Sequence, residues 1–291
     1  MHRHQVHRDP WPDFDAFRVA DHPLELRRDA AWQWGGRAQA EHGSVHQFAA
    51  VARALTELRA PIELLGAIAR LITDEVRHVE LCARAAEAFY PEGDDGFFAW
   101  RRPRAPWPDA PILPPDGRAT ERALRGWTAR AIVVACCLGE TLSKPMLDAV
   151  AVVSTDPLPE SCAKQILRDE RFHASFGWEA AAVLVPELDD TEKDALQSQL
   201  ATSFAGFERT TCGGVTIDDL AEHEEVIERG EPNLGTLSHR QFAAIFFATL
   251  EDEIFPKLES LGLDPMRAWA ERLRHPRDRS PDASAETRGS S

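Results

Sequence analysis

The chain of 291 residues has no excess of basic residues and no long apolar run. Its 33 Lys and Arg residues are outnumbered by 48 Asp and Glu, so the formal net charge of −15 disfavours general binding to nucleic-acid phosphates. The longest apolar run, Ala131 to Leu138, is far shorter than the ~20 residues that span a bilayer. We therefore expect neither a nucleic-acid partner nor a membrane partner. Hydrophobic residues still make up 43% of the chain, enough to build a core.

The chain also lacks paired cysteine motifs and a recognisable targeting segment. Its five cysteines form no C-x-x-C pair, and Cys136 and Cys137 are adjacent, which suits neither a zinc knuckle nor a disulfide framework. Residues 1–8 carry charge but are followed by no apolar stretch, so no secretory signal is expected. These features predict free thiols in a protein of the reducing cytoplasm.

Patterns typical of β-strands are almost absent, whereas apolar residues recur at helical spacing from about residue 30. Four long helices are predicted over about 31–58, 61–90, 119–153 and 159–185. Six prolines between residues 101 and 118 exclude a helix there, so this stretch is expected to be an extended crossover. One long connection between the second and third helices, with short connections elsewhere, is typical of a ferritin-like four-helix bundle. The predicted fold class is therefore all-α.

A single helical domain is predicted over residues 30–275, with the bundle at about 31–185. Further helices are expected at about 190–210, 216–229, 236–261 and 265–274. Residues 1–29 are expected to form a poorly ordered N-terminal arm, and residues 276–291 a disordered tail. The apolar run 243–248 is interpreted as a buried packing helix, with a homodimer contact as the alternative.

The motif Glu-x-x-His occurs twice, and each copy is preceded by Asp: Asp74-Glu75-Val76-Arg77-His78 and Asp169-Glu170-Arg171-Phe172-His173. A spacing of three places the Glu and His side chains on one face of a helix. With 26 Glu and 11 His among 291 residues, about one Glu-x-x-His is expected by chance, but two copies that both carry the preceding Asp are not. The repeat therefore indicates that the two motifs have the same chemical role.

One further carboxylate precedes each motif, Glu41 on the first predicted helix and Glu140 on the third. From Glu41 to the end of its helix is ~25 Å, and from the start of the next helix to Glu75 is ~21 Å, at 1.5 Å per residue. The two carboxylates thus return to nearly the same level. The same holds for Glu140 and Glu170, so the chain contains two copies of one half-site.

Four carboxylates and two imidazoles suit two first-row metal ions, with iron or manganese favoured by the hard oxygen ligands. A zinc site would contain fewer oxygens and more Cys or His. The alternative is that these residues are surface glutamates and capping histidines. If the helix faces are as predicted, however, buried glutamates without a cation would cost several kcal/mol each. The predicted metal ligands are Glu41, Glu75, His78, Glu140, Glu170 and His173.

The two motifs and their partner glutamates resemble those of the non-haem dimetal-carboxylate, ferritin-like proteins, over residues 31 to about 185. The segment from Glu41 to His78 is most similar to bacterial ferritin-like domain proteins. This resemblance implies that Glu75 and Glu170 bridge the metals and that Glu41 and Glu140 are terminal ligands. It also implies that Asp74 and Asp169 each hold the imidazole of the other motif. Arg77 is retained in the first motif, whereas Phe172 replaces it in the second, so the residues behind the ligands are expected to be asymmetric.

Two positions of the chain differ from particular members of this superfamily and limit which members it resembles. Cys82 stands where radical-forming relatives carry a tyrosine, and Tyr90 is the only tyrosine of the chain, so a tyrosyl radical is not expected. Ile166 stands where arylamine oxygenases carry a third histidine. The remaining set of two His and four Glu is similar to that of bacterial hydroxylases, aldehyde-deformylating oxygenases and ferroxidases.

The functional hypothesis is a diiron oxidoreductase that activates O₂ to oxidise or hydroxylate a small organic substrate, with two Fe ions (or Mn) and a possible redox partner for electrons. The first alternative is a ferroxidase or iron-handling protein. The second is a metal-binding scaffold without redox activity. A tRNA hydroxylase, also known in this superfamily, is disfavoured by the net charge of −15.

Overall fold

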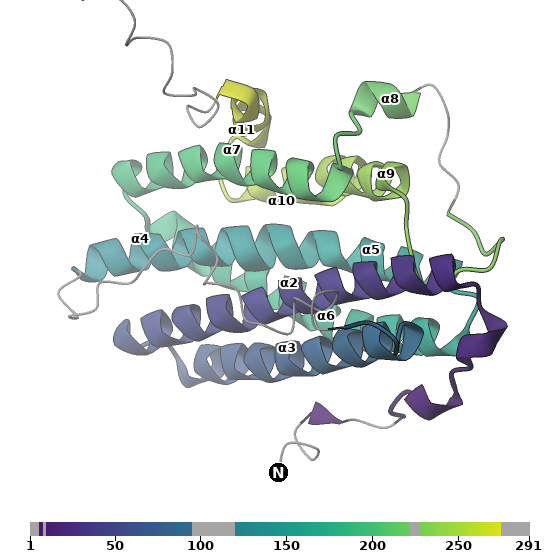
Figure 1. The fold of residues 1–291 in the computed structure, drawn as a ribbon. Helices are drawn as coiled ribbons and strands as arrows, with labels where there is room; N and C mark the ends of the chain where they lie inside the picture. Colours follow the sequence, from purple (N-terminus) through teal and green to yellow (C-terminus); the bar gives the residue numbers. More distant parts are fainter. Residues whose placement is uncertain (1–5, 8–9, 95–119, 222–226, 275–291) are drawn as a thin grey trace, which may run out of the picture.

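The computed structural model describes residues 6–7, 10–94, 120–221 and 227–274. Within these ranges the chain forms helices and no strand, so the all-α fold class is confirmed (Figure 1). The predicted crossover at 101–118 and the predicted tail at 276–291 lie outside the described residues.

Four long helical segments form a bundle at the centre of the molecule (Figure 1). The first two, α2 (Leu24–Glu57) and α3 (Ile62–Phe89), make a hairpin with a short connection. The third is continuous through α4 (Glu121–Ile132), η4 (Val133–Glu140) and α5 (Thr141–Val153), and α6 (Pro157–Leu184) follows it after a short loop. Helix α2 contacts α3 and α4, and α6 contacts α3 and α5. The two hairpins thus pack against each other, as the predicted pairing of half-sites requires.

The C-terminal helices form a further layer over the α4–α5 segment (Figure 1). This layer contains α7 (Asp190–Cys212), α9 (His239–Thr249), η6 (Leu250–Ile254), α10 (Phe255–Ser260) and α11 (Pro265–Glu271). Single-turn helices are η1 (Phe14–Ala16), η2 (Val19–Asp21), η5 (Val185–Glu187), α8 (Ile217–Ala221) and η7 (Arg272–Arg274). In the run 243–248, Ala243 and Phe246 are fully buried, which confirms the interpretation as a packing helix.

Helix α2 begins at Leu24, seven residues before the predicted start at 31. Polar residues hide the helical pattern there, because Arg27 points inward and pairs with Glu92 at 2.8 Å. The described part of the N-terminal arm also contacts the bundle, since the Phe17 ring packs edge-on against Phe89 at 5.1 Å. Local sequence could not show these contacts.

The predicted helix at 216–229 is wrong at its C-terminal end. Helix α8 spans only Ile217–Ala221, and residues 227–229 are not helical; residues 222–226 lie outside the described range. Helix α8 has no buried residue, so burial contributes little to its stability.

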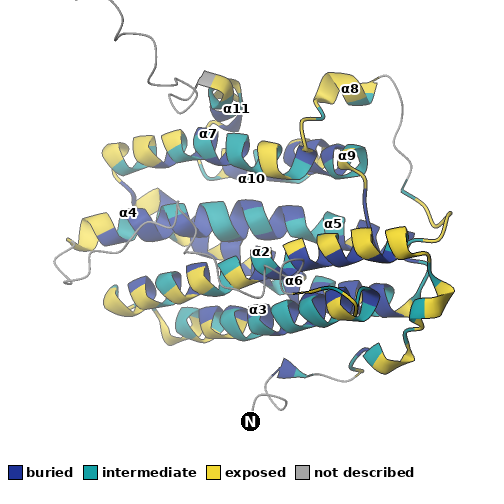
Figure 2. Cartoon of the chain, in the orientation of Figure 1, coloured by how far each residue is buried: buried dark blue, intermediate teal, exposed yellow. Residues whose placement is uncertain are grey.

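The bundle contains two apolar cores separated by a layer of buried polar residues. On α3, Leu71 belongs to the first core and Leu81 to the second, and residues 74–78 lie between them. On α6 the order is reversed, with Ile166 in the second core and Phe176 in the first. The inward faces of these helices are buried along their length (Figure 2). Both duplicated motifs therefore lie at the same level inside the bundle.

Candidate metal centre

Four side chains of the duplicated motifs meet in the polar layer between the two cores. Each of Glu75, His78, Glu170 and His173 offers one ligand atom, and these four atoms lie within 4.8 Å of one another. All four residues are fully buried. Such a cluster could hold a metal ion. Its four residues come from the two copies of the Asp-Glu-x-x-His motif.

Glu75 and Glu170 lie between the two imidazoles. The Glu75 carboxylate is 3.6 Å from His78 Nδ1 and 3.0 Å from His173 Nδ1. The Glu170 carboxylate is 3.4 Å and 3.5 Å from the same two nitrogens. Each of these glutamates can therefore reach a metal ion beside either histidine, which is the position a bridging carboxylate occupies.

Glu41 and Glu140 lie at opposite ends of the cluster. The Glu41 carboxylate is 3.7 Å from His78 Nδ1, and the Glu140 carboxylate is 3.6 Å from His173 Nδ1. Their side chains are 10% and 7% exposed, whereas the central glutamates are fully buried. The structure thus brings together all six predicted ligands, with one outer glutamate beside each histidine.

The cluster contains buried polar atoms without a hydrogen-bond partner. They are both carboxylate oxygens of Glu75 and of Glu170, together with Nδ1 of His78 and of His173. Buried polar groups are almost always satisfied, because leaving one unpaired costs about 1–3 kcal/mol and more for a charged group. Unsatisfied oxygens and nitrogens that face one another fit a metal cation as the missing partner.

Asp169 holds the imidazole of the other motif, as the resemblance implied. Its Oδ2 accepts a hydrogen bond of 3.1 Å from His78 Nε2, and it also pairs with the Arg77 guanidinium. A proton on Nε2 leaves the lone pair on Nδ1, the atom that faces the glutamates. Asp169 therefore holds the His78 imidazole with Nδ1 toward the glutamates.

Asp74 stands in the equivalent place for His173, but the contact is looser. Its Oδ2 lies 3.6 Å from His173 Nε2 and accepts a hydrogen bond of 3.3 Å from Arg70 Nε. The Arg70 guanidinium in turn lies over the Phe172 ring, 4.1 Å from its centroid. The predicted asymmetry is thus present, and Phe172 takes part in it by stacking against Arg70. Arg70 was missed in the sequence, although it lies one helical turn before Asp74.

Glu140 is positioned by a π-helical segment. It is the last residue of η4, where the helix widens between α4 and α5. Pro145 follows within α5 and lacks the N–H that would bond to the Thr141 carbonyl, which favours rearranged hydrogen bonding just before it. Such π-helical segments often occur at functional sites because they redirect a side chain.

Gly177 on α6 permits the close approach of η4. A Cβ at this position would lie 2.5 Å from Cys136 Cβ and 2.8 Å from the Cys136 carbonyl carbon. Real Cβ atoms do not approach backbone that closely, so any larger residue would displace η4. Gly177 lies one turn after His173, and this relationship between a glycine and a widened helix was not visible in the sequence.

Burial and mutual repulsion perturb the titration of the cluster. Burial, opposed by the nearby His78, raises the pKa of Glu75 from 4.5 to about 7. Burial and the Glu140 carboxylate raise the pKa of Glu170 well above 4.5. Burial acts to lower the pKa of His78 and His173, but the surrounding carboxylates outweigh it, and both pKa values are raised above 6.5. The cluster therefore retains protons in the absence of a cation, and a metal ion would displace them.

The cysteines are free and buried, as predicted. Cys82 lies one turn after His78, and Cys136 lies one turn before Glu140. Burial raises the pKa of both thiols well above 9.0, so neither is a thiolate at neutral pH. Both therefore act as small apolar residues beside the cluster.

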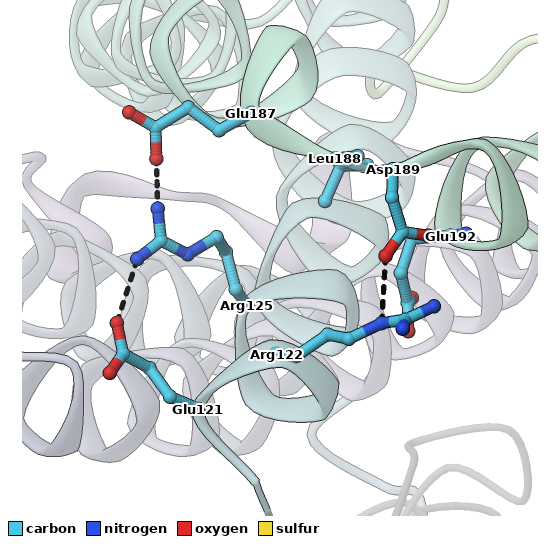
Figure 3. Close-up of a pocket in the computed structure, with 7 residues that line it drawn as sticks. All are labelled: Glu121, Arg122, Arg125, Glu187, Leu188, Asp189 and Glu192. Atoms are coloured by element: carbon cyan, nitrogen blue, oxygen red, sulfur yellow. Dashed lines mark hydrogen bonds and ion pairs between the residues drawn. The ribbon is translucent and has the colours of Figure 1, made fainter.

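A separate pocket of about 240 Å³ lies where the start of α4 meets η5 and the start of α7 (Figure 3). It shares no residue with the cluster of Glu75, His78, Glu170 and His173. Arg125 pairs with both Glu121 and Glu187, and Arg122 pairs with Asp189 at 2.7 Å. Glu192 pairs with Arg130, which lies outside the pocket, so the charges that line this pocket all have partners.

Comparisons with known protein families, with curated proteins and with solved structures found no match to this chain. None of the described helices is long and apolar enough to cross a membrane.

Proposed function

We propose that this protein is a diiron-carboxylate oxidoreductase that uses O₂ to oxidise or hydroxylate a small organic substrate. The observation that carries the proposal is the set of buried, unsatisfied ligand atoms on Glu75, His78, Glu170 and His173. Oxygen-rich ligands with two imidazoles favour iron or manganese over zinc. In this proposal Glu75 and Glu170 bridge two ions, while Glu41 and Glu140 each complete one site.

The charge of the ligand set supports two divalent ions. Four carboxylates offer four negative charges, which two divalent cations neutralise, and the imidazoles bind as neutral ligands. Neutralisation removes the cost of burying Glu75 and Glu170, which in the metal-free protein raises their pKa values. Asp169 keeps the His78 imidazole oriented with Nδ1 toward the ions, and Asp74 lies 3.6 Å from Nε2 of His173.

When bound, the iron pair would supply the redox chemistry with O₂, and the protein would supply a dry, pre-organised site. The apolar cores on both sides of the cluster exclude water and so protect reactive species from side reactions. Hydroxylation of a C–H bond consumes one O₂, two protons and two further electrons, and it releases one water. A redox partner would supply those two electrons.

The test is to load the metal-free protein with Fe(II) under anaerobic conditions, add O₂, and follow the iron absorption, the O₂ consumed and the iron released. We expect two Fe per chain and a transient absorption that decays faster with a suitable organic substrate. Continuous oxidation of added Fe(II) without any organic substrate would identify a ferroxidase instead. Bound iron that does not react with O₂ would identify a redox-silent metal scaffold.

A further inference from the structure

Arg37 on α2 lies one helical turn before Glu41, and one nitrogen of its guanidinium is unsatisfied although the residue as a whole is partly exposed. Its Nη1 is shielded from solvent and has no hydrogen-bond partner. Arg27 and Arg77 also have guanidinium nitrogens without a hydrogen-bond partner, but each pairs with a carboxylate, Glu92 and Asp169 respectively. A buried donor on a charged group is costly without an acceptor, so the Arg37 site calls for an anion.

The position of Arg37 relative to the ligands follows from the helix geometry. Arg37 precedes Glu41 by one helical turn on α2, and Cys82 follows His78 by one turn on the antiparallel α3. Arg37 and Cys82 therefore flank the same end of the cluster, the end that holds Glu41.

Trp34 fixes the guanidinium in this place. The Arg37 Cζ lies over the Trp34 ring, 5.0 Å from its centroid. The indole itself is held because Trp34 Nε1 donates a hydrogen bond of 2.9 Å to the Leu234 carbonyl. The cation is therefore pre-organised, which lowers the entropy cost of binding an anion there.

The surroundings define what kind of anion fits. Ala38, Cys82 and Ile166 are fully or almost fully buried apolar residues at this end of the cluster. A single guanidinium matches the two oxygens of one carboxylate, whereas a polyanion would need more cations and would be repelled by the glutamates. An apolar body with one carboxylate suits this combination.

We infer that Arg37 is a substrate-binding residue that holds the carboxylate of a small, largely apolar organic acid beside the metal centre. This inference rests on the proposed function and names its substrate class. It also favours an organic substrate over Fe(II), because a fixed positive charge beside Glu41 repels an incoming cation. Glu41 is at the more exposed end of the cluster, with 10% of its side chain accessible, where such an acid would approach.

The test uses 4-fluorobenzoate as the probe and its neutral counterpart 4-fluorobenzamide as the control ligand, with the iron-loaded protein. Fluorine NMR reports binding, because paramagnetic iron broadens the signal of a ligand bound near it. Arg37→Gln should weaken 4-fluorobenzoate binding by about 10–100-fold, and Arg37→Lys should restore part of the affinity. Arg53→Gln is the matched control on the same helix, since Arg53 is exposed and pairs with Glu57; it should leave affinity unchanged.

Iron content is measured in every sample before the probe is added. A wild-type chain that holds no iron contradicts the proposed function, whereas a loaded chain that does not bind 4-fluorobenzoate overturns only the inference about Arg37. Equal affinity for acid and amide, or equal affinity in wild type and Arg37→Gln, also overturns it. Loss of iron from Arg37→Gln would assign Arg37 to the support of Glu41 and overturn it as well.

Discussion

The His78 imidazole on α3 donates a hydrogen bond of 3.1 Å to the Asp169 carboxylate on α6, across the interior of the bundle. The bond joins one motif to the other and fixes which imidazole nitrogen faces the glutamates. The reciprocal contact, from His173 to Asp74, is 3.6 Å long. Each half of the site therefore places an aspartate behind its imidazole, but the contact between aspartate and imidazole is longer for His173 than for His78.

Asp169→Asn should weaken iron retention by about 10–100-fold while the helices stay folded, because the amide no longer selects the imidazole tautomer that leaves Nδ1 free. Asp74→Asn should have a smaller effect, since its contact with His173 is longer. Stepwise Fe(II) titration followed by circular dichroism checks both effects. Wild-type iron retention in Asp169→Asn, or two indistinguishable sites in the wild type, would refute this asymmetry.

Removal of a central carboxylate should cost more metal than removal of an outer one. Glu75 contacts both imidazole nitrogens, so Glu75→Ala should lose more than one metal equivalent per chain. Glu41 is near His78 alone, so Glu41→Ala should lose at most one. Elemental analysis of purified variants measures this, with Glu63→Ala as the control because Glu63 is exposed at the start of α3. Equal small losses at positions 41 and 75 would contradict the bridging role.

The metal-free protein should become less stable as the pH rises from about 5 to 8. Between pH 4.5 and 7 the unfolded chain has ionised its glutamates, whereas folded Glu75, with its pKa raised to about 7, still holds a proton. The folded state then binds more protons than the unfolded state, so the free energy of unfolding falls with rising pH. The raised pKa values of His78 and His173 act in the same direction, since the stability they contribute is complete below pH 6.5 and is lost above it.

The expected loss is a few kcal/mol over this range. Urea unfolding in the presence of a chelator measures it, and saturation with a divalent metal should remove or reverse the trend, because metal binding strengthens as the ligands lose protons. A metal-free protein whose stability is constant or increases over this range would show that the cluster is not buried in the protonated form.

Gly177→Ala should disturb the π-helical segment and through it Glu140. The added methyl group would meet the Cys136 backbone, so η4 must shift. We expect a stability loss of about 1–3 kcal/mol and weaker binding of the metal beside His173. Gly66→Ala is the matched control: a Cβ there meets no atom within 4 Å, and the change should stabilise α3 by up to about 1 kcal/mol. Identical behaviour of the two variants in thermal unfolding and metal titration would disprove the role given to Gly177.

Much of the architecture was predictable because it depends on local pattern. Helical periodicity predicted the four long helices, and the repeated Asp-Glu-x-x-His motif with Glu41 and Glu140 predicted which side chains meet. The helical periodicity and the Asp-Glu-x-x-His motif both depend on a fixed spacing of residues along a helix, so both can be recognised from the sequence alone. The cross-pairing of Asp169 with His78 was implied by family resemblance and agrees with the geometry.

What the sequence could not predict depends on tertiary contacts. Arg27 looked like a surface residue but is buried against Glu92, so the start of α2 was placed too late. Residues 227–229 are not helical, although the local pattern predicted a helix through them. Arg37 is an ordinary helix residue by sequence, and only the structure shows that its Nη1 is shielded from solvent and unsatisfied.

We expect the buried cluster to hold two metal ions that Glu75 and Glu170 bridge. Anomalous diffraction at the iron absorption edge, from crystals of protein loaded with Fe(II) without O₂, would locate these ions. We predict two peaks ~3.5–4 Å apart between these carboxylates, one beside His78 Nδ1 and one beside His173 Nδ1. No peak in the cluster, or iron bound only to surface carboxylates, would contradict this expectation.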